Sequence, residues 1–70
     1  MSPLLFVIAA EAYGWQLYQG SEQRYWFARW DDALETADIM AATAHEQRGV
    51  TTAVMVNISG RGTLMVSRHG

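Results

Sequence analysis

Hydrophobic residues occupy both alternating sets of positions in the strand-like segments of this chain. Every residue of Leu4–Ala10 is hydrophobic, and in Thr52–Ile58 the pair Val54 and Val56 stands on one set while Met55 stands on the other. A sheet with one face in water alternates apolar with polar residues. We therefore expect both faces of this sheet to be covered.

The same alternation predicts strands before and after a central helix. In the first half they are Leu4–Glu11, Trp15–Gln19 and a short third strand at Arg24–Ala28. We expect a turn at Tyr13-Gly14, in which Gly14 is free to take a positive φ. The pattern is typical of a meander of two or three strands.

The second half predicts a hairpin of two strands. Thr51–Ile58 is rich in β-branched residues, and Thr63–Arg68 alternates Leu64 and Val66 with polar or thioether residues. Between them, Ser59–Gly62 has two glycines and predicts the hairpin loop.

Helical spacing predicts one helix between these halves. Asp32 is a candidate N-cap with Glu35 completing a capping box, or else an earlier residue caps and Asp31 and Asp32 lie in the first turn. Arg48 suits the last turn, and Gly49 is a natural C′ residue. The expected buried stripe is Ala33, Leu34, Ala37, Met40, Ala41 and Ala44.

These elements predict a single α+β domain over residues 1–70, in the order β-β-(β)-α-β-β. We expect an antiparallel sheet of four or five strands with one α-helix packed on one face. The expected core under the helix is Phe6, Ile8, Trp15, Leu17, Val54, Val56, Leu64 and Val66. The uncovered face would then present a candidate interface of Trp26, Met55, Met65, Tyr18, Val7 and Leu5. A loop folded over this face, or a register slip of one residue that exchanges the faces, are the alternatives.

Composition points to association. A chain of 70 residues buries only about 60% of its unfolded surface, and such small domains add disulfides, metals or partners. There is no cysteine, which excludes disulfides and thiolate metal sites and agrees with a cytoplasmic location. Oligomerisation, as a homodimer, is the expected solution.

Charge disfavours nucleic-acid binding, and hydropathy gives no sign of a membrane span. The net charge is −2, and all five basic residues are arginines, which is not the electrostatic footprint of a nucleic-acid-binding protein. No stretch approaches the ~20 apolar residues of a membrane span. Leu4–Ala10 followed by Ala10-Glu11-Ala12 has some likeness to a secretory signal, but it lacks a basic n-region, and we interpret it as the first strand.

No motif predicts catalysis, a metal or a cofactor. His45 and Glu46 are adjacent on the helix and therefore do not face each other, and His45 and His69 have no metal-ligand spacing. His69-Gly70 is expected to be a frayed end. Gly60-Arg61-Gly62 is explained by a tight turn, although such a loop could also hold a phosphate.

The segment Arg24–Trp30 concentrates four of the eight aromatic residues and two of the five arginines. Three interpretations stay open: core packing by Tyr25 and Phe27, a protein–protein hot spot, and base stacking. The acidic net charge favours protein over nucleic acid.

Two resemblances follow from these residues. The Gly14-Trp15 hairpin, Phe27, the alanine-rich helix and the late glycine hairpin resemble a group of small bacterial β-β-α-β-β proteins of unknown function, which implies the fold and no catalytic residue. The second resemblance is fainter. The order of a strand, a glycine, a strand and then a helix that begins with acidic residues and Ala33-Leu34 is similar to HicB-type antitoxin domains, which bind a toxin and oligomerise.

From the sequence we therefore expect a non-enzymatic protein-interaction or oligomerisation module that forms a homodimer. One alternative is an antitoxin-like protein that binds another protein. Another is a small dimeric α+β enzyme or ligand-binding protein with an inter-subunit pocket lined by His45, Trp26 and Arg24.

Overall fold

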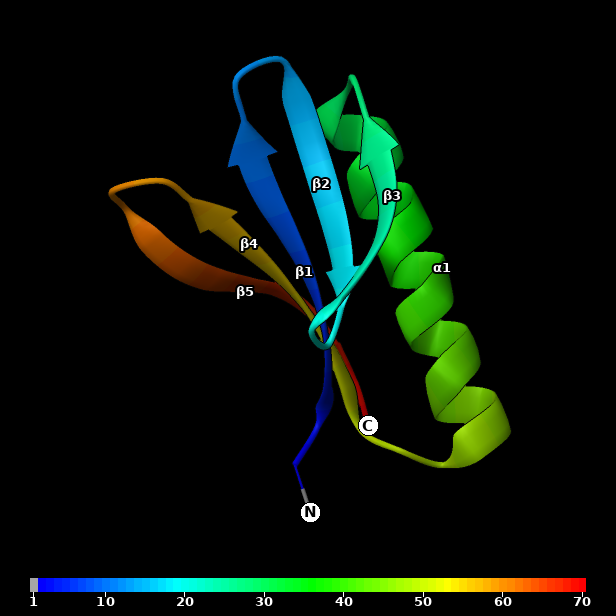
Figure 1. Cartoon of the computed structure of the whole chain (residues 1–70). Helices are drawn as coiled ribbons and strands as arrows, with labels where there is room; N and C mark the ends of the chain where they lie inside the picture. The colour runs from blue at the N-terminus through cyan, green and yellow to red at the C-terminus, as the bar shows by residue number, and fades with distance from the viewer. Residues whose placement is uncertain (1) are drawn as a thin grey trace.

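A five-stranded sheet and one helix make up the computed structural model, which describes residues 2–70 (Figure 1). The predicted α+β class is confirmed, and the third strand is present. The elements are β1 (Leu4–Glu11), β2 (Gly14–Gln19), β3 (Glu22–Phe27), α1 (Trp30–Arg48), β4 (Thr52–Ile58) and β5 (Gly62–His69).

The sheet has the strand order β3-β2-β1-β4-β5, with β1 at its centre. Three of the four neighbouring pairs are antiparallel, but β1 and β4 run parallel, so the sheet is mixed. The reason lies in the connection: two hairpins make β3 parallel to β1, and the helix then returns the chain to the starting end of the sheet. β4 therefore runs in the same direction as β1.

Alanines bring the helix close to the sheet. Ala33, Ala37 and Ala41 are spaced four apart and are completely buried, so this seam of the helix lies directly on the sheet. Phe6 and Ile8 of β1 are among the side chains buried beneath it. The other predicted stripe residues, Leu34, Met40 and Ala44, are partly buried against the same core.

The N-terminus of the helix confirms the second of the two alternatives, in which a residue before Asp31 is the N-cap. The N-cap is Arg29, which makes no side-chain capping hydrogen bond, and Asp31 and Asp32 lie in the first turn. The capping box headed by Asp32 is therefore wrong, and both carboxylates act through the helix dipole. At the other end Gly49 takes the left-handed conformation (φ 67°) and donates its N–H to the carbonyl of His45, as predicted.

Two predicted core residues are exposed. Phe6, Ile8, Leu17, Val54 and Val56 are buried and Trp15 is partly buried, but Leu64 and Val66 are 63% and 41% exposed. The outer part of the β4–β5 hairpin bends away from the helix (Figure 1). The pairing also shifts between Val54 and Met55, which leaves Val66 as an extra residue in β5. The prediction for Leu64 and Val66 is therefore wrong.

Candidate functional site

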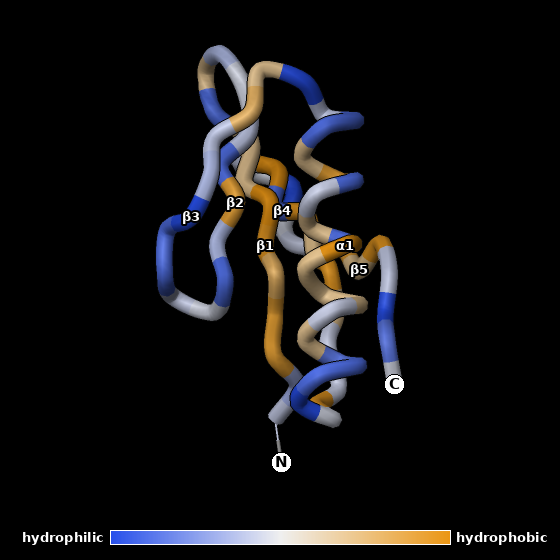
Figure 2. The backbone as a smooth tube through the Cα atoms, turned by 90° about the vertical axis from the view of Figure 1, so that its right-hand side faces the viewer, coloured by the Kyte–Doolittle hydropathy of each residue, from blue (hydrophilic) through white to orange (hydrophobic). Residues whose placement is uncertain are grey.

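The helix lies on one face of the sheet (Figure 2), and the strand register places mainly apolar residues on the opposite face. Residues that stand directly opposite each other in neighbouring strands point to the same face. Val7 pairs with Tyr18 and with Met55, and Met55 pairs with Met65. The register places all six candidate interface residues on this uncovered face, which we call the open face: Leu5, Val7, Tyr18, Trp26, Met55 and Met65.

These six side chains differ in exposure. Met65 and Trp26 are 56% and 50% exposed, Leu5 is 37% exposed, and the remaining three are half-buried. Their use as an interface stays a prediction. Their shared face and incomplete burial are what such a use requires.

One side of the open face contains a hollow of about 330 Å³. It forms over β1, β4 and β5, because the small side chain of Ala53 lies between the longer ones of Leu5, Met55 and Arg68. We call it the Ala53 hollow. Its lining residues are Pro3, Leu5, Thr51, Ala53, Met55, Met65 and Arg68.

The other side of the open face carries the indole of Trp26, which lies against Gly14. A Cβ atom built on Gly14 would meet the indole at 2.3 Å and the Phe27 carbonyl oxygen at 2.4 Å. Gly14 is buried, belongs to β2 and does not have a positive φ. The predicted turn role of Gly14 is therefore wrong, and the position requires glycine because of space.

Gln16 is a buried polar residue that the sequence analysis missed. It is 5% exposed, stands opposite Trp26 on the open face, and donates a side-chain hydrogen bond to the carbonyl of Tyr25 at 2.9 Å. Alternation alone placed Gln16 on the outer face and gave no signal of burial. The Gln16 hydrogen bond links β2 to β3, and Gly14 leaves room for the Trp26 indole to lie against β2.

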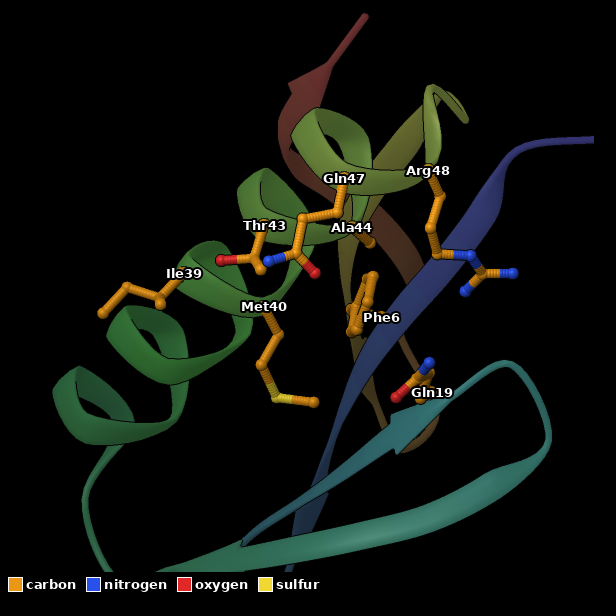
Figure 3. A pocket seen from close by; sticks show the side chains of 8 residues that line it. All are labelled: Phe6, Gln19, Ile39, Met40, Thr43, Ala44, Gln47 and Arg48. Atoms are coloured by element: carbon orange, nitrogen blue, oxygen red, sulfur yellow. The ribbon is translucent and has the colours of Figure 1, made fainter.

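A second recess of about 290 Å³ lies on the helix side (Figure 3). Phe6 and Met40 form its apolar part, with Gln19 at the end of β2 and Arg48 at the end of the helix. Arg48 lies in the last turn of the helix, where its positive charge offsets the negative end of the helix dipole. The full lining is Phe6, Gln19, Ile39, Met40, Thr43, Ala44, Gln47 and Arg48.

A polar cluster joins β5 to the helix. Ser67 Oγ donates a hydrogen bond to Asp38 Oδ1 at 2.6 Å, and His69 Nε2 lies 2.8 Å from the same oxygen. These two hydrogen bonds, that of Ser67 first, lower the pKa of the Asp38 carboxyl. The expectation of a frayed end at His69 is therefore wrong, because β5 continues through His69 and its ring is held by Asp38.

This cluster does not have the geometry of a nucleophilic triad. In a hydrolytic triad the histidine lies between the serine and the carboxylate. Here Asp38 lies between Ser67 and His69, so its carboxylate accepts from both and the imidazole makes no hydrogen bond with the hydroxyl. We interpret the cluster as a structural tie.

The residues of the expected inter-subunit pocket do not come together within one chain. His45 Nδ1 lies 2.8 Å from the carbonyl oxygen of Val50, and Arg24 pairs with Glu22 at 2.7 Å and lies over the Tyr25 ring. None of His45, Arg24 and Trp26 lines either recess. Tyr25, predicted as core, is 46% exposed, whereas Phe27 packs against the core.

Within residues 2–70, no three His, Cys, Asp or Glu side chains gather as they would to hold a metal ion. No helix in that range is long and apolar enough to span a membrane. Comparison with protein-family models, with curated proteins and with solved structures found no match to this chain.

Proposed function

We propose that this protein is a non-enzymatic interaction module that forms a homodimer through its open face. The observation that carries the proposal is the apolar character of that face, where Val7, Met55 and Met65 occupy positions that polar residues fill in a solvated sheet. Aromatic residues and methionine are enriched at the centres of protein interfaces.

The open face is large enough for a dimer. Its five strands are 6 to 8 residues long, and strands spaced ~4.8 Å apart with a rise of ~3.3 Å per residue cover about 550 Å². Two such faces bury about 1,100 Å², which passes the threshold of about 1,000 Å² for a specific interface. A second copy of the chain is therefore an adequate cover for this face.

A dimer also answers the stability problem of a small domain. Within residues 2–70, the core under the helix completely buries only four large apolar side chains, Phe6, Ile8, Leu17 and Val54. A single core of this size supplies only about 3–5 kcal/mol. Burial of the open face adds apolar area without disulfides, which a chain with no cysteine cannot form.

The test is the solution mass, measured by light scattering behind a sizing column over a hundredfold range of protein concentration. We expect a dimer for the wild type and a monomer for Met55→Glu, which places a charge in the middle of the open face. Two matched controls put the same charge on other exposed apolar positions: Ile39→Glu on the helix and Leu64→Glu on the β4–β5 hairpin. Both are expected to stay dimeric.

A wild-type monomer throughout this range would overturn the proposal and leave the open face for a different protein, as the antitoxin-like alternative requires. Dissociation by Leu64→Glu with Met55→Glu unaffected would instead place the contact at the β5 edge. Dissociation by Ile39→Glu alone would place it at the helix recess. Each outcome therefore assigns one surface.

A further inference from the structure

We infer that the two copies interlock reciprocally, with Trp26 of each chain entering the Ala53 hollow of the other. The inference rests on the proposed self-association and specifies its register. It commits to a second copy of this chain as the occupant of the hollow.

Trp26 and the Ala53 hollow lie on opposite sides of the central strand. Trp26 is on β3 and is level with Gln16 and with Ala9, toward the end of β1. The hollow extends over β4 and β5 and is level with Leu5, toward the start of β1. The two features are thus diagonally opposed across the open face.

A twofold axis exchanges features that are placed in this way. An axis that lies in the interface plane, crosses β1 near Val7 and runs obliquely to the strands brings Trp26 of each copy over the hollow of the other. The two sheets then cross at a steep angle, as in orthogonal sheet packing. The contact is isologous, because each copy inserts its Trp26 into the partner and accepts the partner's Trp26 in its own Ala53 hollow.

The shapes are complementary as well. One side of the indole is fixed against Gly14, while half of the Trp26 surface is exposed. The indole is therefore held in place before association, which lowers the entropy lost on binding. The hollow exists because the residue at its centre, Ala53, is small. Ala53 itself is only 2% exposed, so the surface that meets an entering side chain belongs mainly to the longer residues around it.

The chemistry of the hollow suits an indole. Met55 and Met65 line it with thioethers, which make favourable contacts with aromatic rings. Arg68 lies at its rim, and within residues 2–70 no carboxylate oxygen is within 4 Å of its guanidinium. A guanidinium that is free in this way can lie over the partner's indole as a cation–π contact.

The first experiment mixes two variants that carry opposite charges. Trp26→Lys and Met55→Glu are each expected to weaken homodimerisation about 30-fold or more, as hot-spot changes do. In a mixture, one contact of the heterodimer brings the introduced lysine of one chain to the introduced glutamate of the other, and the second contact is the native one. We expect native mass spectrometry to show the mixed dimer at concentrations where each variant alone is a monomer.

A matched pair of variants tests the arginine at the hollow against an arginine elsewhere on the surface. Arg68→Gln is expected to weaken the dimer about 3-fold, in keeping with an exposed cation–π contact. Arg61→Gln, at the tip of the β4–β5 hairpin, removes the same charge outside the hollow and is expected to leave the dimer unchanged. An equal effect of both would assign the loss to net charge and overturn the role of Arg68.

Because Trp26→Lys also removes the cover over Gly14, a second measurement keeps Trp26 intact. An unlabelled Thr51→Cys chain carries a nitroxide at the rim of the hollow and is mixed with ¹⁵N-labelled wild type. We expect the indole N–H signal of Trp26 to be broadened more than those of Trp15 and Trp30. A nitroxide at Ile39→Cys, on the helix, should not produce this preference.

The outcomes separate this inference from the proposed function. A dimer by mass in which the charged variants do not complement each other, and in which Trp26 is not preferentially broadened, would overturn the register and leave the open-face dimer standing. A wild-type monomer would overturn both. Complementation together with preferential broadening would support both.

Discussion

Replacement of Gly14 by alanine should destabilise the domain, although alanine is the better strand residue. Gly14 has no positive φ, so alanine causes no backbone strain there and would by itself add about 0.5–1 kcal/mol through a less flexible unfolded chain. The space for its methyl group is missing. The added Cβ would lie 2.3 Å from an indole carbon of Trp26 and 2.4 Å from the Phe27 carbonyl oxygen.

The magnitude follows from which of these neighbours can move. Carbon atoms in contact are normally about 3.5–4.0 Å apart, so each neighbour must shift by about 1 Å. Trp26 is half exposed and can swing outward, at the loss of its packing on β2. Phe27 O is main chain, and its residue is paired with Trp15 in the sheet. Overpacking of this kind costs about 1–3 kcal/mol, and with a main-chain neighbour we expect about 2 kcal/mol net.

Urea unfolding followed by circular dichroism measures this loss. For a domain of this size, 2 kcal/mol corresponds to a fall in Tm of about 8–16 °C. All variants must be compared at one protein concentration, because a dimer raises apparent stability with concentration. In a Trp26→Ala background, Gly14→Ala should cost less but not nothing, because the Phe27 carbonyl stays in place. A Gly14→Ala protein as stable as the wild type would refute the steric argument.

Two further predictions concern the contacts between helix and sheet. The hydroxyl of Thr52, which is completely buried, donates to the Ala41 carbonyl at 2.8 Å, so Thr52→Val should lower the free energy of unfolding by about 1 kcal/mol; a loss below about 0.3 kcal/mol in urea unfolding would contradict it. The hydrogen bonds from Ser67 and His69 lower the pKa of Asp38 below its unfolded value of about 3.9. Its contribution is therefore complete above that value and is lost as the pH falls through the folded pKa. Because Asp38 is half exposed, Asp38→Asn should lower the free energy of unfolding by under about 1 kcal/mol at pH 7. This loss should shrink below about pH 4. A loss that grows at low pH would exclude this origin.

The elements of the fold were predictable because their signals are local. The alanine stripe, the two first-turn aspartates and Gly49 each report on neighbours within a turn of the helix, and the structure confirms the helix that they predict. The parallel pairing of β1 with β4 is different in kind. It depends on counting two hairpins and one crossover, and the antiparallel sheet that we expected did not include this parallel pair.

The errors arise where the sheet departs from regular alternation. Leu64 and Val66 alternate as core residues do, but the bulge and the bend of the β4–β5 hairpin move them beyond the helix. Gln16 shows the opposite error: its position predicts exposure, and Trp26 and a backbone acceptor bury it. Alternation placed the six open-face residues on one face, as the register does, although Tyr18 and Met55 adjoin register shifts. Their use as an interface stays a prediction. Alternation contains no information about a partner for this face.

The alanine seam connects the fold to the proposed association. Because Ala33, Ala37 and Ala41 contribute so little side-chain volume, the helix lies close to the sheet and the core beneath it is thin. A thicker core would need larger helix residues, which would lift the helix from β1 and β4. The remaining way to bury more apolar surface is on the opposite face, where Met55, Met65 and Trp26 lie. Folding and association should therefore be coupled, so that the wild-type Tm rises with protein concentration whereas that of monomeric Met55→Glu does not.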